Sequence, residues 1–400
     1  MIVVQINTGI GFGSIGRIAD QIGALVDKEG GSCYYAHGSR YITHKASTAI
    51  QIGAKWEDYI HYVISFLSGY DGIGSVCATK RLVKRLKEIK PDVVHLHNIH
   101  GFYVNYKILF AYLVEADIPI VWTFHDCWPI TGHCPYFDSV NCMKWKIGCH
   151  DCPLRNDYPR SLFFDQSAHN YALKKASFTS VKNLTIVPVS DWLCNIVKDS
   201  YLKDANIKVI HNGVDINIFK PQKTNIRRIY NIPDSKKIVL GVASGWDERK
   251  GFSDFIKMAE IESFQIIMVG NIDVDASRLP PNIIHIKNTN SQYELAEFYS
   301  AADVFANPTY SDNFPTTNIE ALACGTPVVT YNTGGSPEAI DENTGIIVPQ
   351  GDLEAFINSI KSLCLSNKPV DVCRGRAEKY FNKDERFADY IKLYNDIISK

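Results

Sequence analysis

The sequence of 400 residues has no long hydrophobic run and almost no net charge. No stretch of about eighteen uninterrupted apolar residues occurs, so we expect no transmembrane helix. A formal net charge of −1 gives no general attraction to nucleic acid, and no nucleic-acid partner is expected. The first residues, MIVVQINTGIGFG, lack the positively charged segment that opens a signal peptide, which predicts a cytoplasmic protein. Internal repeats and long linkers rich in proline and glycine are also missing.

The composition is that of a globular protein with more than one core. Hydrophobic residues make up 46% of the chain and charged residues 21%. A chain of this length exceeds one ordinary hydrophobic core, so two domains are predicted. The 11 cysteines are spread unevenly, and a reducing compartment argues against a framework of disulfides.

The most informative stretch is residues 307–338, NPTYSDNFPTTNIEALACGTPVVTYNTGGSPE. A loop runs into a short helical segment, 318–323, which Gly325 ends because glycine tolerates a positive φ. Thr317 and Glu320 have the spacing of a capping box, which offers one interpretation of this carboxylate. The start of such a helix presents unpaired N–H groups and the positive end of a dipole, and both suit a phosphate.

This stretch also resembles a known family. Asp312 and Glu320 stand eight residues apart, and EALACGTPVV follows from the second acid. The pattern looks like the acid-x7-acid signature of retaining, GT-B-fold glycosyltransferases of family 4. In most members both acids are Glu, so Asp312 is a shortened version of the first one.

The resemblance covers nearly the whole chain and implies an α/β protein of the GT-B fold, with two Rossmann-like domains facing across a cleft. The implied parts are an acceptor-binding domain at 1–205 with a Cys-rich insert at about 127–160, a nucleotide-sugar-binding domain at 206–380, and a final helix at 381–400 that returns to the first domain.

The resemblance also implies roles at the donor site. Glu320 would bind ribose hydroxyls and Asp312 hydroxyls of the donor sugar, while Lys250 and the N–H groups of Thr316 and Thr317 would hold the phosphates. Because a lysine and a helix terminus supply this charge, no catalytic metal is expected. Similar enzymes carry an arginine where this chain has Gly245. Arg249 is the candidate replacement for that arginine. The further donor-site candidates are Gly270, Lys287, Thr289, Asn313 and Phe314.

A glycine motif follows the first predicted strand, with Gly11, Gly13 and Gly16 spaced as G-x-G-x-x-G. A dinucleotide site would need an acidic residue after the second strand, and none stands near His37. The alternatives are a tight strand-to-helix turn, or a loop facing the donor diphosphate. The resemblance favours the last and points to Gly11, Gly13 and, on the acceptor side, Arg17.

Polar residues follow two further buried strands, and ligands of open α/β sheets bind at such strand ends. The TFHD sequence resembles the family's strand-end histidine, so His125 is expected near the donor sugar. The acceptor candidates are His97, Asn98, His100 and Asp126. A histidine at such a position is as often a structural hydrogen-bond partner.

Four cysteines lie close together in CPYFDSVNCMKWKIGCHDC, namely Cys134, Cys142, Cys149 and Cys152. Four thiolates grouped in this way can close a tetrahedral zinc site, which would be structural because no position stays open for substrate. Two disulfides and unpaired structural cysteines are the alternatives. The segment resembles an insert in the branch of the family assigned to colanic-acid-like exopolysaccharide and capsule synthesis.

Residues 76–90 form an amphipathic helical pattern with lysines and arginines along one face. Such a face can dock on the inner surface of an anionic membrane, or it can simply be solvated.

We therefore predict a retaining glycosyltransferase that moves a sugar from a nucleoside-diphosphate sugar to a growing, lipid-linked glycan acceptor in surface polysaccharide biosynthesis. It would be cytoplasmic, with peripheral contact to the membrane. The alternative is a catalytically idle scaffold of the same fold in a polysaccharide-assembly complex. A nucleic-acid-binding zinc module would need a strongly basic face, which a pI near 6.9 disfavours.

Overall fold

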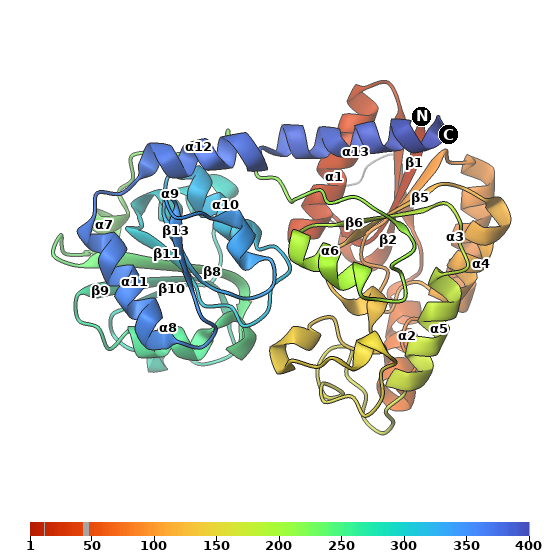
Figure 1. Cartoon of the computed structure of the whole chain (residues 1–400), viewed down its shortest axis with the longest axis horizontal. Coiled ribbons are helices and arrows are strands. Elements are labelled where there is room, and N and C mark those ends of the chain that lie inside the picture. Colours follow the sequence, from red (N-terminus) through yellow and green to blue (C-terminus); the bar gives the residue numbers. More distant parts are fainter. Residues whose placement is uncertain (12, 43–47, 400) are drawn as a thin grey trace. The chain divides into compact units, whose positions relative to one another are not determined.

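The computed structural model describes residues 1–11, 13–42 and 48–399 (Figure 1). The chain divides into two compact units. The first comprises Met1–His211 together with Phe387–Lys400, and the second comprises Asn212–Arg386. Both units are α/β, with helices packed on a parallel sheet. Within the described ranges, no helix combines the length and apolar character needed to span a bilayer.

The sheet of the first unit has the order β3-β2-β1-β4-β5-β6-β7, and its neighbouring strands pair in parallel. Strands such as β4 and β5 are buried along their whole length, as expected when helices cover both faces of a parallel sheet. Its strands are β1 (Ile2–Ile10), β2 (Ser32–Ile42), β3 (Ala49–Gln51), β4 (Val93–Leu96), β5 (Ile120–Phe124), β6 (Leu184–Pro188) and β7 (Asn206–Ile207). The helices of this unit are α1 (Gly13–Lys28), α2 (Lys55–Ser68), α3 (Val76–Ile89), α4 (Tyr106–Ala116), α5 (Ser167–Phe178) and α6 (Asp191–Lys198).

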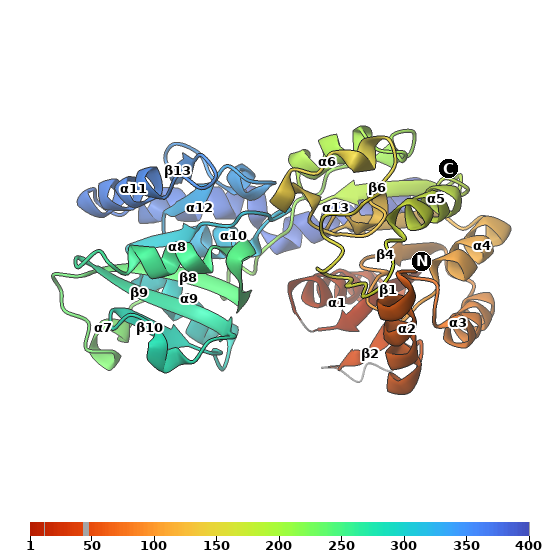
Figure 2. The ribbon, with the colours of Figure 1, turned by 90° about the horizontal axis from the view of Figure 1, so that it is seen from below.

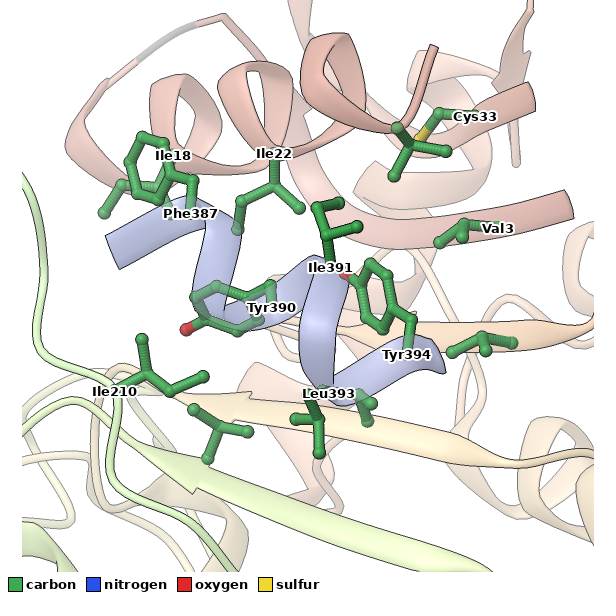
Figure 3. Close-up of a cluster of buried hydrophobic side chains, with 14 of the residues drawn as sticks. Val3, Ile18, Ile22, Cys33, Ile210, Phe387, Tyr390, Ile391, Leu393 and Tyr394 are labelled. Atoms are coloured by element: carbon green, nitrogen blue, oxygen red, sulfur yellow. The ribbon is translucent and has the colours of Figure 1, made fainter. Parts of the chain in front are cut away.

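The last helix, α13 (Lys383–Ile398), completes the core of the first unit. Phe387, Ile391 and Tyr394 point toward α1 and β1, as Figure 3 shows. The Tyr394 hydroxyl donates to Nδ1 of His95 at 2.6 Å, and Thr123 donates to the Tyr390 hydroxyl at 3.2 Å. The helix thus contributes both apolar surface and buried hydrogen bonds to a sheet built mainly from the first half of the chain.

The sheet of the second unit has the order β10-β9-β8-β11-β12-β13, again with parallel pairs. Its strands are β8 (Lys237–Trp246), β9 (Phe264–Ile272), β10 (Ile283–Ile286), β11 (Val304–Asn307), β12 (Val328–Tyr331) and β13 (Gly345–Val348). Its helices are α7 (Ile226–Ile229), α8 (Phe252–Met258), α9 (Gln292–Ala301), α10 (Thr316–Ala323), α11 (Leu353–Leu365) and α12 (Val370–Phe381).

The division between the units lies later in the chain than the predicted boundary at 205/206. Residues Asn206 and Ile207 pair with Thr185 and Ile186 of β6, so they extend the first sheet. The first unit consequently continues to His211.

The Cys-rich insert has little regular structure. Residues 125–166, all of which the structure describes, contain 3-10 turns but no α-helix or strand. The segment runs as loops in yellow in Figures 1 and 2. Its buried apolar side chains include Phe137 and Trp145, whose ring centroids are 5.0 Å apart. All of the cysteines lie in the described ranges and are free, so the alternative of two disulfides is not the state seen here.

Candidate functional site

Two of the predicted catalytic residues, Lys250 and Asp312, are in contact. Lys250 ends a 3-10 turn after β8, and Asp312 lies in the loop between β11 and α10. Their Nζ and Oδ2 atoms form an ion pair, and the two side chains are 21% and 18% exposed. The 3-10 turn is held by Asp247, whose Oδ1 accepts from the N–H of Lys250 at 2.8 Å. A cation and a carboxylate therefore meet at a position that solvent, and hence a ligand, can reach.

The loop that carries Asp312 is packed closely against the turn after β12. Gly334 has a φ of +55°, and a Cβ atom at this residue would lie 1.9 Å from the carbonyl oxygen of Asp312. The N–H of Gly335 donates to that same oxygen at 3.1 Å. Only glycine allows this approach, which fixes the backbone beneath the carboxylate.

Arg249 also holds this loop. Its Nη1 donates to the carbonyl of Ser311 at 3.1 Å, and its own carbonyl accepts from the N–H of Tyr310 at 2.7 Å. At Gly245 a Cβ atom would meet nothing within 4 Å, so a side chain can leave the backbone there without a clash. The replacement of that arginine by Arg249 stays a prediction.

Glu320 is not a capping residue. Helix α10 begins at Thr316, its N-cap is Pro315, and no side chain caps it, so the capping-box interpretation of Thr317 and Glu320 is wrong. Glu320 is buried within the helix, and its Oε2 accepts from the Tyr299 hydroxyl at 2.8 Å. Burial, together with the neighbouring carboxylate, raises the pKa of Tyr299 well above its usual value. The hydroxyl therefore stays a donor and orients the carboxylate.

The start of α10 has the form expected of an anion site. Thr316 and Thr317 occupy its first two positions, where N–H groups have no acceptor inside the helix. Phe314 and Asn313 are buried just before it, and the Phe314 carbonyl accepts from Asn212 at 3.2 Å. The entry to the helix is thus fixed while its N–H groups point along the axis.

The remaining donor candidates lie near strand ends of the same sheet. Gly270 has a φ of +129°, and a Cβ atom there would lie 1.9 Å from the carbonyl oxygen of Ala243. Lys287 is exposed and Thr289 half-buried in the loop that follows β10. All three belong to the second unit, as predicted from the order of motifs.

In the first unit, the glycine motif forms the turn between β1 and α1. Gly11 and Gly13 have φ values of +64° and +65°. A Cβ atom at Gly16 would lie 3.1 Å from the carbonyl oxygen of Gly9, so the helix packs tightly on the strand. Arg17, in the first turns of α1, is half-buried. Strand β2 continues to Ile42, and no acidic residue occurs between His37 and Gln51, so the feature that a dinucleotide site requires is missing.

His125 is supported by a second buried imidazole. Its Nε2 lies 3.1 Å from Nδ1 of His97, and Nε2 of His97 lies 2.9 Å from Oε1 of Gln5. The amide of Gln5 is oriented by its own bond to the carbonyl of Ala19 at 2.7 Å. Because the Gln5 oxygen can only accept, His97 donates through Nε2 and accepts from His125 through Nδ1.

Both imidazoles are held neutral. Burial lowers the pKa of His125 to about 4, with Asp126 opposing the shift, and burial lowers the pKa of His97 well below its usual value. His97 is 1% exposed with both nitrogens occupied, so it cannot contact an acceptor directly. The prediction that His97 binds the acceptor is therefore wrong, and His97 instead supports His125.

Two of the other acceptor candidates, Asn98 and His100, line a cavity of the first unit. His100 lies 2.8 Å from Oδ2 of Asp126 through Nε2 and 2.9 Å from the Tyr158 hydroxyl through Nδ1. Burial opposes ionisation of Asp126, but His100 and the N–H of Trp128 outweigh it and lower its pKa. The cavity has a volume of about 260 Å³. Its lining includes Asn98, His100, Phe102, Tyr103 and Tyr158.

The basic helix is α3, at the predicted position, and several of its cations are paired. Arg81 bonds to Glu57 at 2.6 Å and Lys87 to Glu115 at 3.1 Å. Lys80 and Lys84 are exposed. These pairs favour a solvated face for part of the helix.

Comparison with known proteins divides the chain close to the boundary between the two units. The family described as Glycosyltransferase Family 4 matches residues 40–218, and the family described as Glycosyl transferases group 1 matches residues 222–380. An Escherichia coli (strain K12) protein assigned to colanic acid biosynthesis as the glycosyl transferase WcaC is 21% identical over 328 residues, which span 77% of each chain.

Solved structures share the fold over the whole length. A sucrose-phosphate synthase from Thermosynechococcus elongatus aligns with a TM-score of 0.71 at 18% identity, covering 100% of this chain and 99% of that one. Anabaena HepE, solved in complex with UDP-glucose, aligns with a TM-score of 0.67 at 14% identity, covering 99% of this chain and 100% of that one. The chain therefore belongs to the glycosyltransferases of the GT-B fold, with a Glycosyltransferase Family 4 domain followed by a group 1 glycosyl transferase domain.

Proposed function

We propose that this glycosyltransferase moves a sugar, with retention of configuration, from a nucleoside-diphosphate sugar to a growing glycan acceptor in surface polysaccharide biosynthesis. The observation that carries the donor assignment is the cluster in the second unit: the Lys250–Asp312 ion pair, the buried Glu320 and the open start of α10. The WcaC assignment supports the pathway, and the HepE complex supports a nucleotide-sugar donor for the fold.

The chemistry follows from charge placement. The bond between the anomeric carbon and the diphosphate oxygen breaks, and negative charge develops on the diphosphate. Lys250 and the N–H groups of Thr316 and Thr317 would stabilise that charge, so this chain needs no metal for the purpose. The acceptor hydroxyl would attack on the leaving-group face and pass its proton to the departing phosphate. Glu320 would hold the ribose hydroxyls, and Asp312 hydroxyls of the donor sugar.

The acceptor would bind in the first unit, at the cavity beside His100. Its aromatic lining can stack on the apolar face of a sugar ring, while Asn98 offers polar contacts. At about 260 Å³ the cavity fits a single sugar residue at the end of a glycan, being slightly below the usual range for small-molecule pockets.

We further propose that the acceptor is lipid-linked and that α2 brings the first unit to an anionic membrane surface. The burial of this helix is the reverse of the usual pattern, because it buries Asp58, His61 and Ser65 and exposes apolar side chains. The exposed ones are Trp56, Tyr59, Ile60, Ile64 and Leu67, from 42% to 64% exposed.

The surface continues beyond the helix. Phe163 and Phe164 are 62% and 57% exposed, and the adjacent Leu162 N–H donates to the Phe66 carbonyl at 2.7 Å, so the segment lies against α2. Next to it, Arg81 of α3 bonds to Glu57 of α2, which brings the exposed lysines of α3 close to the apolar face. Aromatic and aliphatic side chains beside lysines are the composition of a helix that lies in the interface of an anionic bilayer.

Sedimentation with vesicles containing phosphatidylglycerol tests this surface. The double variant Trp56→Ser, Ile60→Ser should bind roughly tenfold or more weakly, because each side chain contributes about 1 kcal/mol or more when buried in lipid. The control, Tyr293→Ser with Leu365→Ser, removes exposed apolar side chains from the second unit and should bind normally. Unchanged binding of the first variant would contradict the proposal. So would self-association of the wild type that the same two substitutions abolish, since α2 would then be a dimer contact.

The transfer itself is tested by Glu320→Gln. The amide can still accept from Tyr299, so the fold should persist while ribose binding and turnover fall. Glu342→Gln, on the exposed surface of the same unit, is the matched control. Melting shifts with UDP, GDP, dTDP, CMP and NAD would identify the base, because a ligand at a hundred times its Kd adds about 2.7 kcal/mol. A catalytically idle scaffold would show no nucleotide shift and no loss in the variant, and that result would overturn the enzyme proposal.

A further inference from the structure

The geometry points to a structural zinc ion held by Cys134, Cys142, Cys149 and Cys152. These residues lie in the insert between β5 and α5, and none of them takes part in the transfer proposed above. The inference is therefore independent of that function.

The four cysteines share one site. All of them line a single small cavity, together with Phe137 and other residues of the insert. The thiols of Cys134 and Cys152 interact with each other. The N–H of Gly132 donates to Sγ of Cys149 at 3.1 Å. A backbone donor aimed at a sulfur orients it and favours its thiolate form, which is the form that binds metal.

The four cysteines line one cavity, but their sulfurs are farther apart than in a zinc site with the metal bound. In the part of the chain that the structure describes, no three of the four sulfurs lie within 4.8 Å of one another. Zinc–sulfur bonds of about 2.3 Å in a tetrahedron would bring each pair of sulfurs to roughly 3.8 Å. The cysteines sit in turns and loops, so a metal could draw them together without unfolding a helix or strand.

The backbone around the cavity is already cross-linked. Nζ of Lys144, two residues after Cys142, donates to the carbonyl oxygens of His150 and Asp151 at 3.1 and 2.9 Å. These two carbonyls lie between Cys149 and Cys152. One lysine thus joins the segment that carries one proposed ligand to the segment that carries two others.

A buried cation lies in the same region of the first unit. Lys174 of α5 is 0% exposed, and its Nζ donates to the carbonyls of Trp128 and Thr131 at 2.9 and 3.1 Å. The acidic groups that act on its charge include Asp71, Cys149 and Cys134. Four thiolates on Zn²⁺ carry a net charge of −2, and a lysine ammonium beneath them would offset part of it. Neutral thiols would leave Asp71 as the main counter-charge of this ammonium.

The insert also has a structural need for such an ion. Residues 125–166 bury Trp128, Ile130, Phe137, Trp145 and Leu154 but contain no strand or α-helix, so no regular ladder of backbone hydrogen bonds holds them. Small irregular regions are commonly held by a metal or by disulfides. All four ligand positions would be sulfur, leaving no place for a substrate, so the ion would stabilise the insert and take no part in catalysis.

The test is the metal content of the full chain, purified under reducing conditions without a polyhistidine tag and measured by inductively coupled plasma mass spectrometry. The wild type should hold one zinc per chain, and X-ray absorption should show four sulfur ligands. Cys149→Ser and Cys142→Ser should lose most of the zinc and melt at lower temperature. The control Cys194→Ser replaces a buried cysteine of α6 outside the cluster and should keep its zinc.

If the ligand variants fail to fold, the wild type alone decides. A mercurial reagent that captures thiolates should release one zinc per chain, read with a chromogenic chelator. A wild-type protein without zinc would overturn the inference, whether its four thiols are all alkylated in the folded state or are joined in disulfides. Zinc that persists in Cys149→Ser and Cys142→Ser would overturn this ligand set.

Discussion

The hydrogen bond from Tyr299 to Glu320 allows a sharp test of the donor site. The substitution Tyr299→Phe removes the hydroxyl that lies 2.8 Å from Oε2 of Glu320 and leaves the ring in place. The tyrosine is 0% exposed and the glutamate 7%, so little water can replace the lost donor. A hydrogen bond to a charged group contributes about 1.5–3 kcal/mol. For a unit of this size that loss lowers the melting temperature by roughly 3–12 °C.

Binding should weaken as well as stability. If Glu320 holds the ribose hydroxyls, a carboxylate without its orienting donor makes poorer bonds to them. A deficit of about 0.5–1.5 kcal/mol raises the Kd for the nucleoside diphosphate roughly two- to tenfold. Isothermal titration calorimetry, performed well below both melting temperatures, measures this change.

Tyr331→Phe is the matched control. Tyr331 is equally buried in the same unit, but its hydroxyl donates to a carboxylate oxygen of Asp254 at 3.0 Å and not to Glu320. We expect it to lose stability while its nucleotide affinity stays at the wild-type value. Equal effects of the two substitutions on affinity would refute the reasoning, because Tyr299 would then act on the fold alone.

Three further predictions concern other residues. Gly270→Ala should lower the free energy of unfolding by about 1–3 kcal/mol or more in urea titrations, since the new Cβ atom would lie 1.9 Å from the carbonyl of Ala243 at a φ of +129°. Gly245→Arg should fold normally, because a Cβ atom at this position meets nothing within 4 Å. The added arginine should tighten diphosphate binding severalfold in calorimetry. Weaker binding would count against the proposed phosphate position. The pKa of His125 is lowered to about 4. Below about pH 6.5 the unfolded chain therefore binds a proton that the folded chain does not. The free energy of unfolding should fall from about pH 6.5 to 4 by about 1.4 kcal/mol per pH unit for this group. Urea unfolding at pH 7 and pH 5 measures the last effect, and equal stability at both values would contradict it.

Local motifs predicted the parts of the site that depend on short-range order. The segment from Asp312 through EALACGTPVV forms a loop and helix α10 close to the expected positions, and Gly325 has the positive φ of a helix end. The start of α10 was misplaced because Pro315, which fixes its own φ, occupies the N-cap and no side chain is needed there.

The partners of the site residues could not be predicted, because they come from distant parts of the chain. Gln5 reaches His97 across 92 positions, and Tyr299 reaches Glu320 from another helix. No periodicity in the sequence encodes such a pair, since it depends on how strands are ordered in the sheet.

Helix α2 has a regular sequence pattern that does not match its burial. Its apolar residues recur at helical spacing, and the usual rule would bury them. The helix instead buries Asp58 and His61, with Asp58 accepting from the N–H of Ser39 at 3.1 Å and His61 lying 2.9 Å from the Ser75 hydroxyl. Hydrogen bonds hold both polar side chains in the interior, and the apolar face is left exposed.

The insertion of α13 into the first unit has a consequence for biosynthesis. A ribosome releases β1 and α1 long before it releases Phe387, Tyr390 and Tyr394, yet these late residues fill the same core. Until they emerge, apolar side chains such as Ile22 are left without part of their packing, and His95 lacks its bond to Tyr394. The core of the first unit is therefore incomplete while the whole second unit is synthesised. No single cut in the chain can therefore yield the first unit intact.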